Sequence, residues 1–306
     1  MVSSNGYQDS ITRSSISLEG VPAILKKGPL TLLVVILMVA SWGAGFIASN
    51  SSGSVTSHKI RVYFGAAAEV PEQEIVALFE NRTGIKVEYT ISGSGTLLST
   101  IQMGKVGDLY APGSPDFMQM ALNQGVMVND TVKILAYVVP EIIVQKGNPK
   151  NITSLDDLAR PGIRVGIANP ESVCVGLYAV EILNRSGLWE NVRPNIVVYA
   201  KSCSDAASLV VTRSVDAIIG WNVFYNWTPD KVDIVYLKPE QIPRIAYLPI
   251  GITKYSDDLA SAQKLIDFML SQESQAIFAK YGYFATLNDA KKLAPYASAD
   301  SLIGVP

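Results

Sequence analysis

The chain has 306 residues, of which 48% are hydrophobic, and a formal net charge of −2. A chain of this length can form two medium-sized domains with well-filled cores, and its near-neutral charge gives no electrostatic basis for binding nucleic acid. The single histidine, His58, lies in a Ser/Gly-rich stretch. Catalysis by a Ser–His or Cys–His pair, or by a histidine-bound metal, is therefore difficult to build.

The N-terminal part predicts export. Residues 1–29 are expected to form a cytoplasmic region, and 30–48 are uncharged and apolar over a length that can span a bilayer. Lys26 and Lys27 before this segment favour the cytoplasmic side. It is interpreted as a transmembrane or signal helix, either a cleaved secretory signal, a retained anchor or a prepilin-like signal, with a buried core helix as the weakest alternative. No cysteine follows it, so no lipoprotein anchor is expected, and the polar residues 49–59 predict a flexible linker.

From residue 60 onward, short β runs alternate with helical patterns. Two long extended segments with internal prolines, 131–149 and 242–252, interrupt this alternation. Alternating strands and helices predict α/β layers with mostly parallel sheets, and the two extended segments predict crossings between two lobes. Strands are expected at 59–64, 85–91, 162–168, 195–200, 215–221 and 233–237, and helices at 71–82, 95–104, 114–125, 176–185, 205–213 and 257–281. Leu259 belongs to the expected apolar stripe of the last helix.

These elements predict a division of the chain into lobes. The first lobe is expected to combine residues 60–138 with 247–285, and the second lobe to comprise 139–246. Residues 286–306 are expected to form a separate C-terminal tail.

The turns between strands and helices carry the chemistry of the chain. They are rich in Gly, Ala and Ser, and contain no Lys or Arg except Lys201. Helix N-termini present free N–H groups and a partial positive charge, so small residues there allow an anion to reach the backbone. Ordinary helix capping is the alternative for any one turn. The turns are 65–69, 92–96, 112–116, 169–176 and 201–205.

Two further residue types stay ambiguous from their positions alone. Cys174 and Cys203 are the two cysteines of the chain, and either one disulfide or two buried free thiols would explain them. Trp221, at the end of an expected strand, could line a cleft with its indole N–H or belong to the core.

The order of several motifs resembles the molybdate-binding proteins of ABC importers, and among them an archaeal-like member. The motifs are "GAAAEV", "SGSGTLLSTIQMG", "GDLYAPGS", "VDAIIGW" and "SQAIFAKYGY", within residues 60–285. The resemblance implies an α/β, two-lobed periplasmic-binding-protein fold of type II, the Venus-flytrap fold. It also implies an extracytoplasmic protein that performs no reaction, needs no cofactor or metal, and delivers molybdate or tungstate to a membrane permease and its ATPase.

The same resemblance implies ligand contacts position by position. Glu69 stands where the family has its first serine, and Trp221 stands where it has a tyrosine, whereas Ser94 matches the second serine. The remaining contacts fall in the second lobe, so the two cysteines would flank one site as a disulfide or a close thiol pair. The complete expected set is Ala67, Ala68, Glu69, Ser94, Gly95, Ser114, Cys174, Val175, Cys203, Ser204 and Trp221.

Glu69 leaves the identity of the ligand undecided, because an ionised carboxylate repels a neighbouring oxyanion. It could point away and cap its helix, which we favour, or donate a hydrogen bond in its protonated form. It could also coordinate the metal centre of the oxyanion, or the ligand could be sulfate, phosphate, or a metal cation or chelate. Two further alternatives are an enzyme with Glu69 as general base, and a membrane-tethered sensory module without a transport partner.

Overall fold

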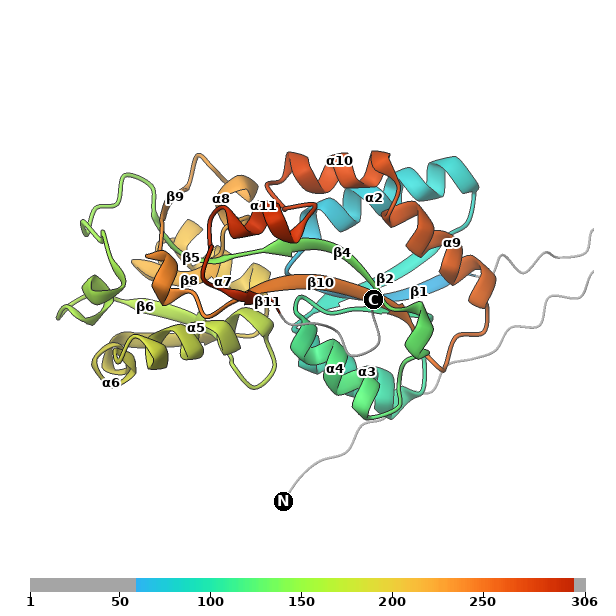
Figure 1. The fold of residues 1–306 in the computed structure, drawn as a ribbon, viewed down its shortest axis with the longest axis horizontal. Coiled ribbons are helices and arrows are strands. Elements are labelled where there is room, and N and C mark those ends of the chain that lie inside the picture. Colours follow the sequence, from blue (N-terminus) through green and yellow to red (C-terminus); the bar gives the residue numbers. More distant parts are fainter. Residues whose placement is uncertain (1–58, 300–306) are drawn as a thin grey trace, which may run out of the picture. The chain divides into compact units, whose positions relative to one another are not determined.

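A computed structural model describes residues 59–299, which all fall within one compact unit of the chain. Their strands form two sheets, one at each end of the ribbon in Figure 1. Among residues 59–299, no helix is long and apolar enough to cross a membrane. The expected cytoplasmic region, the apolar segment 30–48 and nearly all of the linker lie outside the described residues.

The first sheet has the strand order β11-β10-β3-β1-β2, and β4 also pairs with β10. β1, β2 and β3 run parallel, whereas β10 is antiparallel to β3 and β4. We call this sheet with its helices the first lobe. Its strands are Ile60–Gly65 (β1), Val87–Ser92 (β2), Leu109–Ala111 (β3), Lys133–Val138 (β4), Arg244–Ile252 (β10) and Ser298–Ala299 (β11), and its helices are Glu69–Thr83 (α2), Ser94–Gly104 (α3), Pro115–Asn123 (α4), Leu259–Met269 (α9) and Gln272–Lys280 (α10), with a 3₁₀ turn at Asn129–Thr131.

The second sheet has the order β7-β6-β8-β5-β9. β6 runs parallel to β7 and β8, whereas β5 is antiparallel to β8 and β9. This sheet and its helices form the second lobe. Its strands are Pro140–Gln145 (β5), Val165–Ala168 (β6), Ile196–Ala200 (β7), Ala217–Trp221 (β8) and Val232–Val235 (β9), its helices are Cys174–Arg185 (α5), Trp189–Val192 (α6), Cys203–Val211 (α7) and Phe224–Trp227 (α8), and 3₁₀ turns occupy Leu155–Ala159, Arg193–Asn195 and Pro239–Gln241.

The chain crosses between the sheets at Val139, which separates β4 from β5. The backbone N–H of Val139 donates to the side chain of Asn222, and the Asn222 N–H donates back to the Val139 carbonyl. The extended segment 131–149 is thus two strands in different sheets. The return crossing lies before Arg244, three residues earlier than the expected boundary at 246/247, because the start of β10 already pairs with β4 and β11.

Two expectations about the C-terminal part are wrong. The long helix 257–281 is two helices, and Ser271 caps the second by accepting a hydrogen bond from the N–H of Ser274. Leu259 is 56% exposed instead of buried, because it begins α9 at the surface. Residues 286–299 are also no separate tail. They form α11 (Leu287–Lys291) and β11, and their buried alanines join the core of the second lobe.

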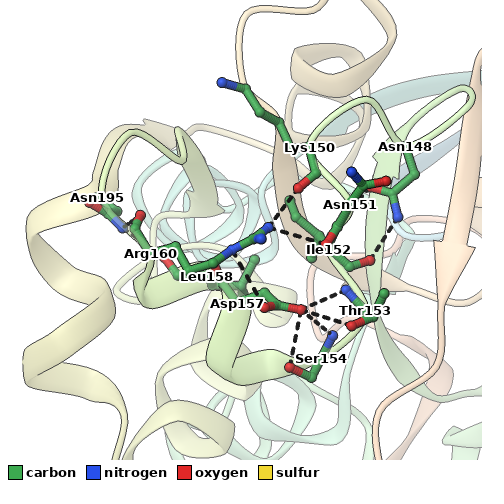
Figure 2. Close-up of polar contacts among 10 residues, drawn as sticks. All are labelled: Asn148, Lys150, Asn151, Ile152, Thr153, Ser154, Asp157, Leu158, Arg160 and Asn195. Atoms are coloured by element: carbon green, nitrogen blue, oxygen red, sulfur yellow. Dashed lines mark hydrogen bonds and ion pairs between the residues drawn. The ribbon is translucent and has the colours of Figure 1, made fainter.

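Polar contacts hold the connection between β5 and β6 in place, as Figure 2 shows. The Asp157 carboxylate accepts hydrogen bonds from the backbone N–H groups of Thr153 and Ser154 at 2.7 and 3.0 Å. Arg160 donates to the carbonyl of Lys150 at 2.6 Å. The hydrogen bond from Thr153 is the main reason why the pKa of Asp157 lies below its usual value. These bonds cap the 3₁₀ turn Leu155–Ala159 and fix the residues before it, in a connection whose apolar side chains, including Ile152, are buried in the second lobe.

Candidate functional site

In the first lobe, β1, β2 and β3 each end in a turn that begins a helix. Because the carboxyl ends of parallel strands meet at one edge of a sheet, these turns lie together. The hydroxyl oxygen of Ser94 accepts a hydrogen bond from the backbone N–H of Gly113 at 3.0 Å, and Ser94 is buried. A Cβ on Gly113 would lie 2.5 Å from the Cβ of Ala67. The first wall of the site is therefore made of backbone and very small side chains.

Two other small residues of this wall have different contacts. Ser114 is fully buried, and its hydroxyl donates to the Asp116 carboxylate at 2.8 Å. Ala68 is buried as the N-cap of α2 without a side-chain capping bond. Tyr283, which the sequence reasoning did not select, donates its hydroxyl to the carbonyl of Ala67 at 2.7 Å. The "YGY" motif that contains it was noticed for the resemblance, but gave no signal for this contact.

In the second lobe, α5 and α7 begin with the two cysteines. Both thiols are buried, and their sulfur atoms are 3.5 Å apart. The cysteines are free, so the expected disulfide is absent and the alternative of a close thiol pair is the one observed. Burial, followed by the neighbouring Cys203, raises the pKa of the Cys174 thiol well above its usual value. The second wall thus presents two buried thiols in contact with each other.

The two walls touch. A Cβ on Gly113 would lie 2.7 Å from the Cys174 sulfur, and a Cβ on Gly93 would lie 2.7 Å from the carbonyl oxygen of Lys201. The backbone N–H of Gly95 donates to the carbonyl of Ser172 across the lobes at 2.9 Å. The structure therefore shows the lobes closed on each other along the turns that were predicted to hold a ligand.

Glu69 connects the two lobes instead of capping its helix. The hydroxyl of Ser204, in the first turn of α7, donates to the Glu69 carboxylate. The expectation that Glu69 points away as a cap is wrong, because Ala68 holds the capping position and Glu69 reaches the other lobe. Glu72, one turn further along α2, was missed: its Oε2 is buried without a hydrogen-bond partner among the described residues. Burial, and then Glu69, raise the pKa of Glu72 well above the usual value.

Trp221 and Val175 are core residues that also adjoin the thiols. The ring of Trp221 is fully buried and packs edge-on against Tyr178, with 4.9 Å between centroids. Its indole nitrogen has no hydrogen-bond partner of normal geometry among the described residues, and its nearness lowers the pKa of Cys174 in part. The backbone N–H of Val175 acts on Cys174 in the same direction. The structure therefore places Trp221 in the core, and its role as a donor to a ligand stays a prediction.

Arg244 adds a charge bridge that the sequence reasoning also missed. Its guanidinium contacts Asp116 of α4 and Glu181 of α5, each at 2.8 Å, and lies 4.1 Å from the centre of the Tyr178 ring. It thereby links the first lobe to the second. No sequence pattern marks this arginine, because its partners come from two helices that are distant along the chain.

The site as a whole offers hydrogen-bond donors and few charges. The first turns of α2, α3, α4, α5 and α7 carry N–H groups that cannot bond within their own helices, except at Pro71 and Pro115. Of these N–H groups, that of Gly95 already donates to Ser172 and that of Asp205 to the Ser202 hydroxyl. Among residues 59–299, there is no group of three or more His, Cys, Asp or Glu side chains that could hold a metal ion. This arrangement suits the binding of an anion by backbone dipoles.

A family model of bacterial extracellular solute-binding proteins matches residues 60–284. The chain belongs to this family. Its relatives include the molybdate-binding protein of Escherichia coli K12, which is 26% identical over 74% of this chain and 88% of the relative. They also include the sulfate-binding protein of Synechococcus elongatus, which is 22% identical over 90% and 87% of the two chains.

A solved structure is similar in fold. The periplasmic molybdate-binding protein of Azotobacter vinelandii superposes with a TM-score of 0.66 at 18% identity, over 74% of this chain and 99% of that one. At this identity the likeness concerns the fold alone. The expected resemblance to molybdate-binding proteins and the two-lobed α/β fold of periplasmic binding proteins are thus confirmed for this solute-binding protein.

Proposed function

We propose that this protein captures a tetrahedral oxyanion, molybdate or tungstate, between its two lobes and delivers it to an ABC importer. The observation that supports this most is the meeting of small-residue helix N-termini from both lobes, with Ser94 on one side and the two thiols on the other. The molybdate-binding relatives support the same ligand class. The partners would be a membrane permease and its ATPase, and the protein would work on the extracytoplasmic side of that membrane.

Binding energy would come from closure of the lobes around the anion. Contacts such as the hydrogen bond from Gly95 to Ser172 exist only when the lobes meet, so a ligand that brings the lobes together is favoured over one that leaves them apart. Fixed N–H, O–H and S–H donors would select by size and charge, because a smaller or protonated anion leaves some of them unpaired.

Sulfate is a second candidate, favoured by the sulfate-binding relative. It is also tetrahedral and doubly charged, but smaller than molybdate, so the same donors would fit it less well. A binding role is preferred to catalysis, because Glu69 is already engaged with Ser204 and no histidine is present among the described residues.

Calorimetric titration of the purified full-length protein with molybdate, tungstate, sulfate and phosphate tests this proposal. We expect tight binding of the first two and weak or no binding of the others. Ser94→Ala should weaken molybdate binding about tenfold, the value of about one hydrogen bond, whereas Ser208→Ala, on the exposed face of α7, should not. Tight binding of sulfate alone would show that sulfate, and not molybdate or tungstate, is the ligand. No binding of any of the four anions would refute the proposal.

A further inference from the structure

We propose that Cys174 and Cys203 form a thiol–disulfide modification site that controls the oxyanion site. In this proposal, the reduced pair permits binding and the disulfide weakens it. The inference rests on the proposed function, since it concerns the regulation of that same site. It starts from the free state of both thiols and their separation of 3.5 Å.

The geometry of the pair suits oxidation without a large rearrangement. Both cysteines begin helices of the second lobe, so no movement between the lobes is needed to join them. A disulfide has a sulfur–sulfur bond of about 2.0 Å, so the sulfurs must approach each other by roughly 1.5 Å. That approach would shift the first turns of α5 and α7, which adjoin Gly113 and Glu69 of the first lobe.

The pair also lies where the ligand is proposed to bind. The Cys174 sulfur is next to Gly113 of the first wall, 2.7 Å from the position of an added Cβ. The indole nitrogen of Trp221, which is fully buried and has no hydrogen-bond partner among the described residues, acts on the same sulfur. The indole N–H is therefore a buried donor without a partner beside the thiol pair, as expected of a group that awaits a ligand.

Oxidation would change what the second wall offers to an anion. Because one S–H of the pair donates to the other sulfur, the protonated pair has one S–H donor left for a ligand, and a disulfide has none. The raised pKa of Cys174 is consistent with this, because it keeps the thiol protonated and avoids a negative charge beside an oxyanion. The disulfide form should therefore bind an oxyanion more weakly than the reduced form.

Access to the thiols depends on the state of the lobes. Each cysteine is 1% exposed in this closed arrangement, so a reagent can reach the pair only when the lobes separate. A bound ligand that holds the lobes together should protect both thiols. Ligand binding and oxidation would then oppose each other, as linked equilibria require.

The chemical step is thiol–disulfide exchange with a small-molecule disulfide. One cysteine thiolate attacks a sulfur of the reagent, so that a mixed disulfide forms on the cysteine and the first small thiolate leaves. The second cysteine attacks its neighbour's sulfur and releases the second small thiol. Two electrons pass from the cysteines to the reagent, and its two sulfurs take up the two protons. Extracytoplasmic compartments are often oxidising enough to support such exchange.

The test uses the purified full-length protein, reduced with dithiothreitol or treated with oxidised glutathione. Intact-mass measurement and thiol counting after denaturation follow disulfide formation, and calorimetry follows molybdate binding. We expect the affinity for molybdate to fall about tenfold after oxidation, from the loss of the free S–H donor and the shift of the first turns of α5 and α7, with recovery on reduction. We also expect bound molybdate to slow disulfide formation about tenfold or more.

The double variant Cys174→Ser/Cys203→Ser is the control, and its affinity should be the same with and without oxidant. Equal molybdate affinity of the reduced and oxidised protein, or failure of the ligand-free protein to form the disulfide, would overturn the inference. If the reduced protein binds none of the four oxyanions, the proposed function itself fails, which is a different result from the same titration.

Discussion

The two walls of the site differ in what they are made of. In the first lobe, Ala67, Ser94 and Gly113 contribute backbone and one hydroxyl beside the Glu69 carboxylate, whereas the second lobe presents two thiols and an indole. The first wall is fixed, because adding a single methyl group to Gly113 would collide with both Ala67 and Cys174. The second wall carries groups that chemistry can alter. The comparison suggests that the first lobe sets the geometry of binding and the second lobe adjusts its strength.

The largest expected effect comes from blocking contact between the walls. In Gly93→Ala, the new methyl group would lie 2.7 Å from the Lys201 carbonyl and 3.0 Å from the Ser172 carbonyl, both backbone atoms of the second lobe. Because the closest atoms all belong to the other lobe, the first lobe should fold normally while closure is hindered. We expect molybdate affinity to fall about 100-fold, measured by calorimetry.

Gly104→Ala is the matched control for this variant. Gly104 ends the same helix, α3, and its added methyl group would meet only the side chain of Val106, which can move. The control should bind molybdate as the unmodified protein does. Equal affinity of Gly93→Ala and Gly104→Ala would show that binding does not require the closure seen here.

A buried carboxyl in the second lobe predicts a dependence of stability on pH. Burial raises the pKa of Glu141, on β5, from its usual 4.5 to about 8. The folded protein therefore holds this proton more tightly than the unfolded chain. The contribution of protonated Glu141 to the free energy of unfolding is complete below pH 4.5 and is lost as the pH rises to about 8. Between pH 4.5 and 7, Glu141 should cost roughly 3 kcal/mol of unfolding free energy.

Glu141→Gln should remove this cost. The glutamine keeps an acceptor for the N–H of Leu237, which bonds the Glu141 side chain, but cannot ionise. Denaturant unfolding at pH 5 and pH 7.5 measures the effect, and the variant should gain stability mainly at the higher pH. Glu190→Gln, at an exposed position of α6, should change neither value. An equal response of Glu141→Gln at both pH values would contradict the raised pKa.

A smaller effect is expected at Glu69, where the two walls exchange a hydrogen bond. Glu69→Gln keeps an acceptor for Ser204 and removes a negative charge beside the proposed anion, so molybdate binding should tighten about three- to tenfold. Calorimetry of the variant, with Glu190→Gln as the control for a remote charge, measures this. A sharp loss of affinity would instead show that the carboxylate itself contacts the ligand.

The smallest effect concerns Arg244, whose ion pairs join α4 of the first lobe to α5 of the second. Arg244→Met should lower affinity about threefold, because partly exposed ion pairs contribute little. Small-angle scattering of the ligand-free variant should show a larger radius of gyration if the lobes open. Arg193→Met, which removes an exposed pair within α6 and its following turn, is the control. Unchanged scattering and affinity would show that the bridge does not hold the lobes.

Most strands and helices of the described part could be predicted from the sequence, because hydrophobic periodicity and Gly or Pro punctuation are local signals. The break before Ser271 and the burial of Ala290 could not. A serine within a helical pattern caps a new helix only if the chain turns there, and alanines in a polar segment become core only when another lobe covers them.

The same limit applies to the site. Ser94, Cys174 and Cys203 could be selected because they lie in turns of small residues at helix starts. The Glu69–Ser204 contact and the Arg244 bridge join residues more than 60 positions apart, and no local pattern encodes such a contact. The ring of Trp221, on strand β8, packs against Tyr178 of helix α5, a contact that the local sequence does not indicate.

Anomalous diffraction from crystals of the full-length protein grown with molybdate tests the central claim most directly, because molybdenum scatters where the anion sits. The account predicts one strong peak between the two walls, within hydrogen-bonding reach of Ser94 and of the first turns of α5 and α7. A peak elsewhere, with none between these walls, would contradict the account.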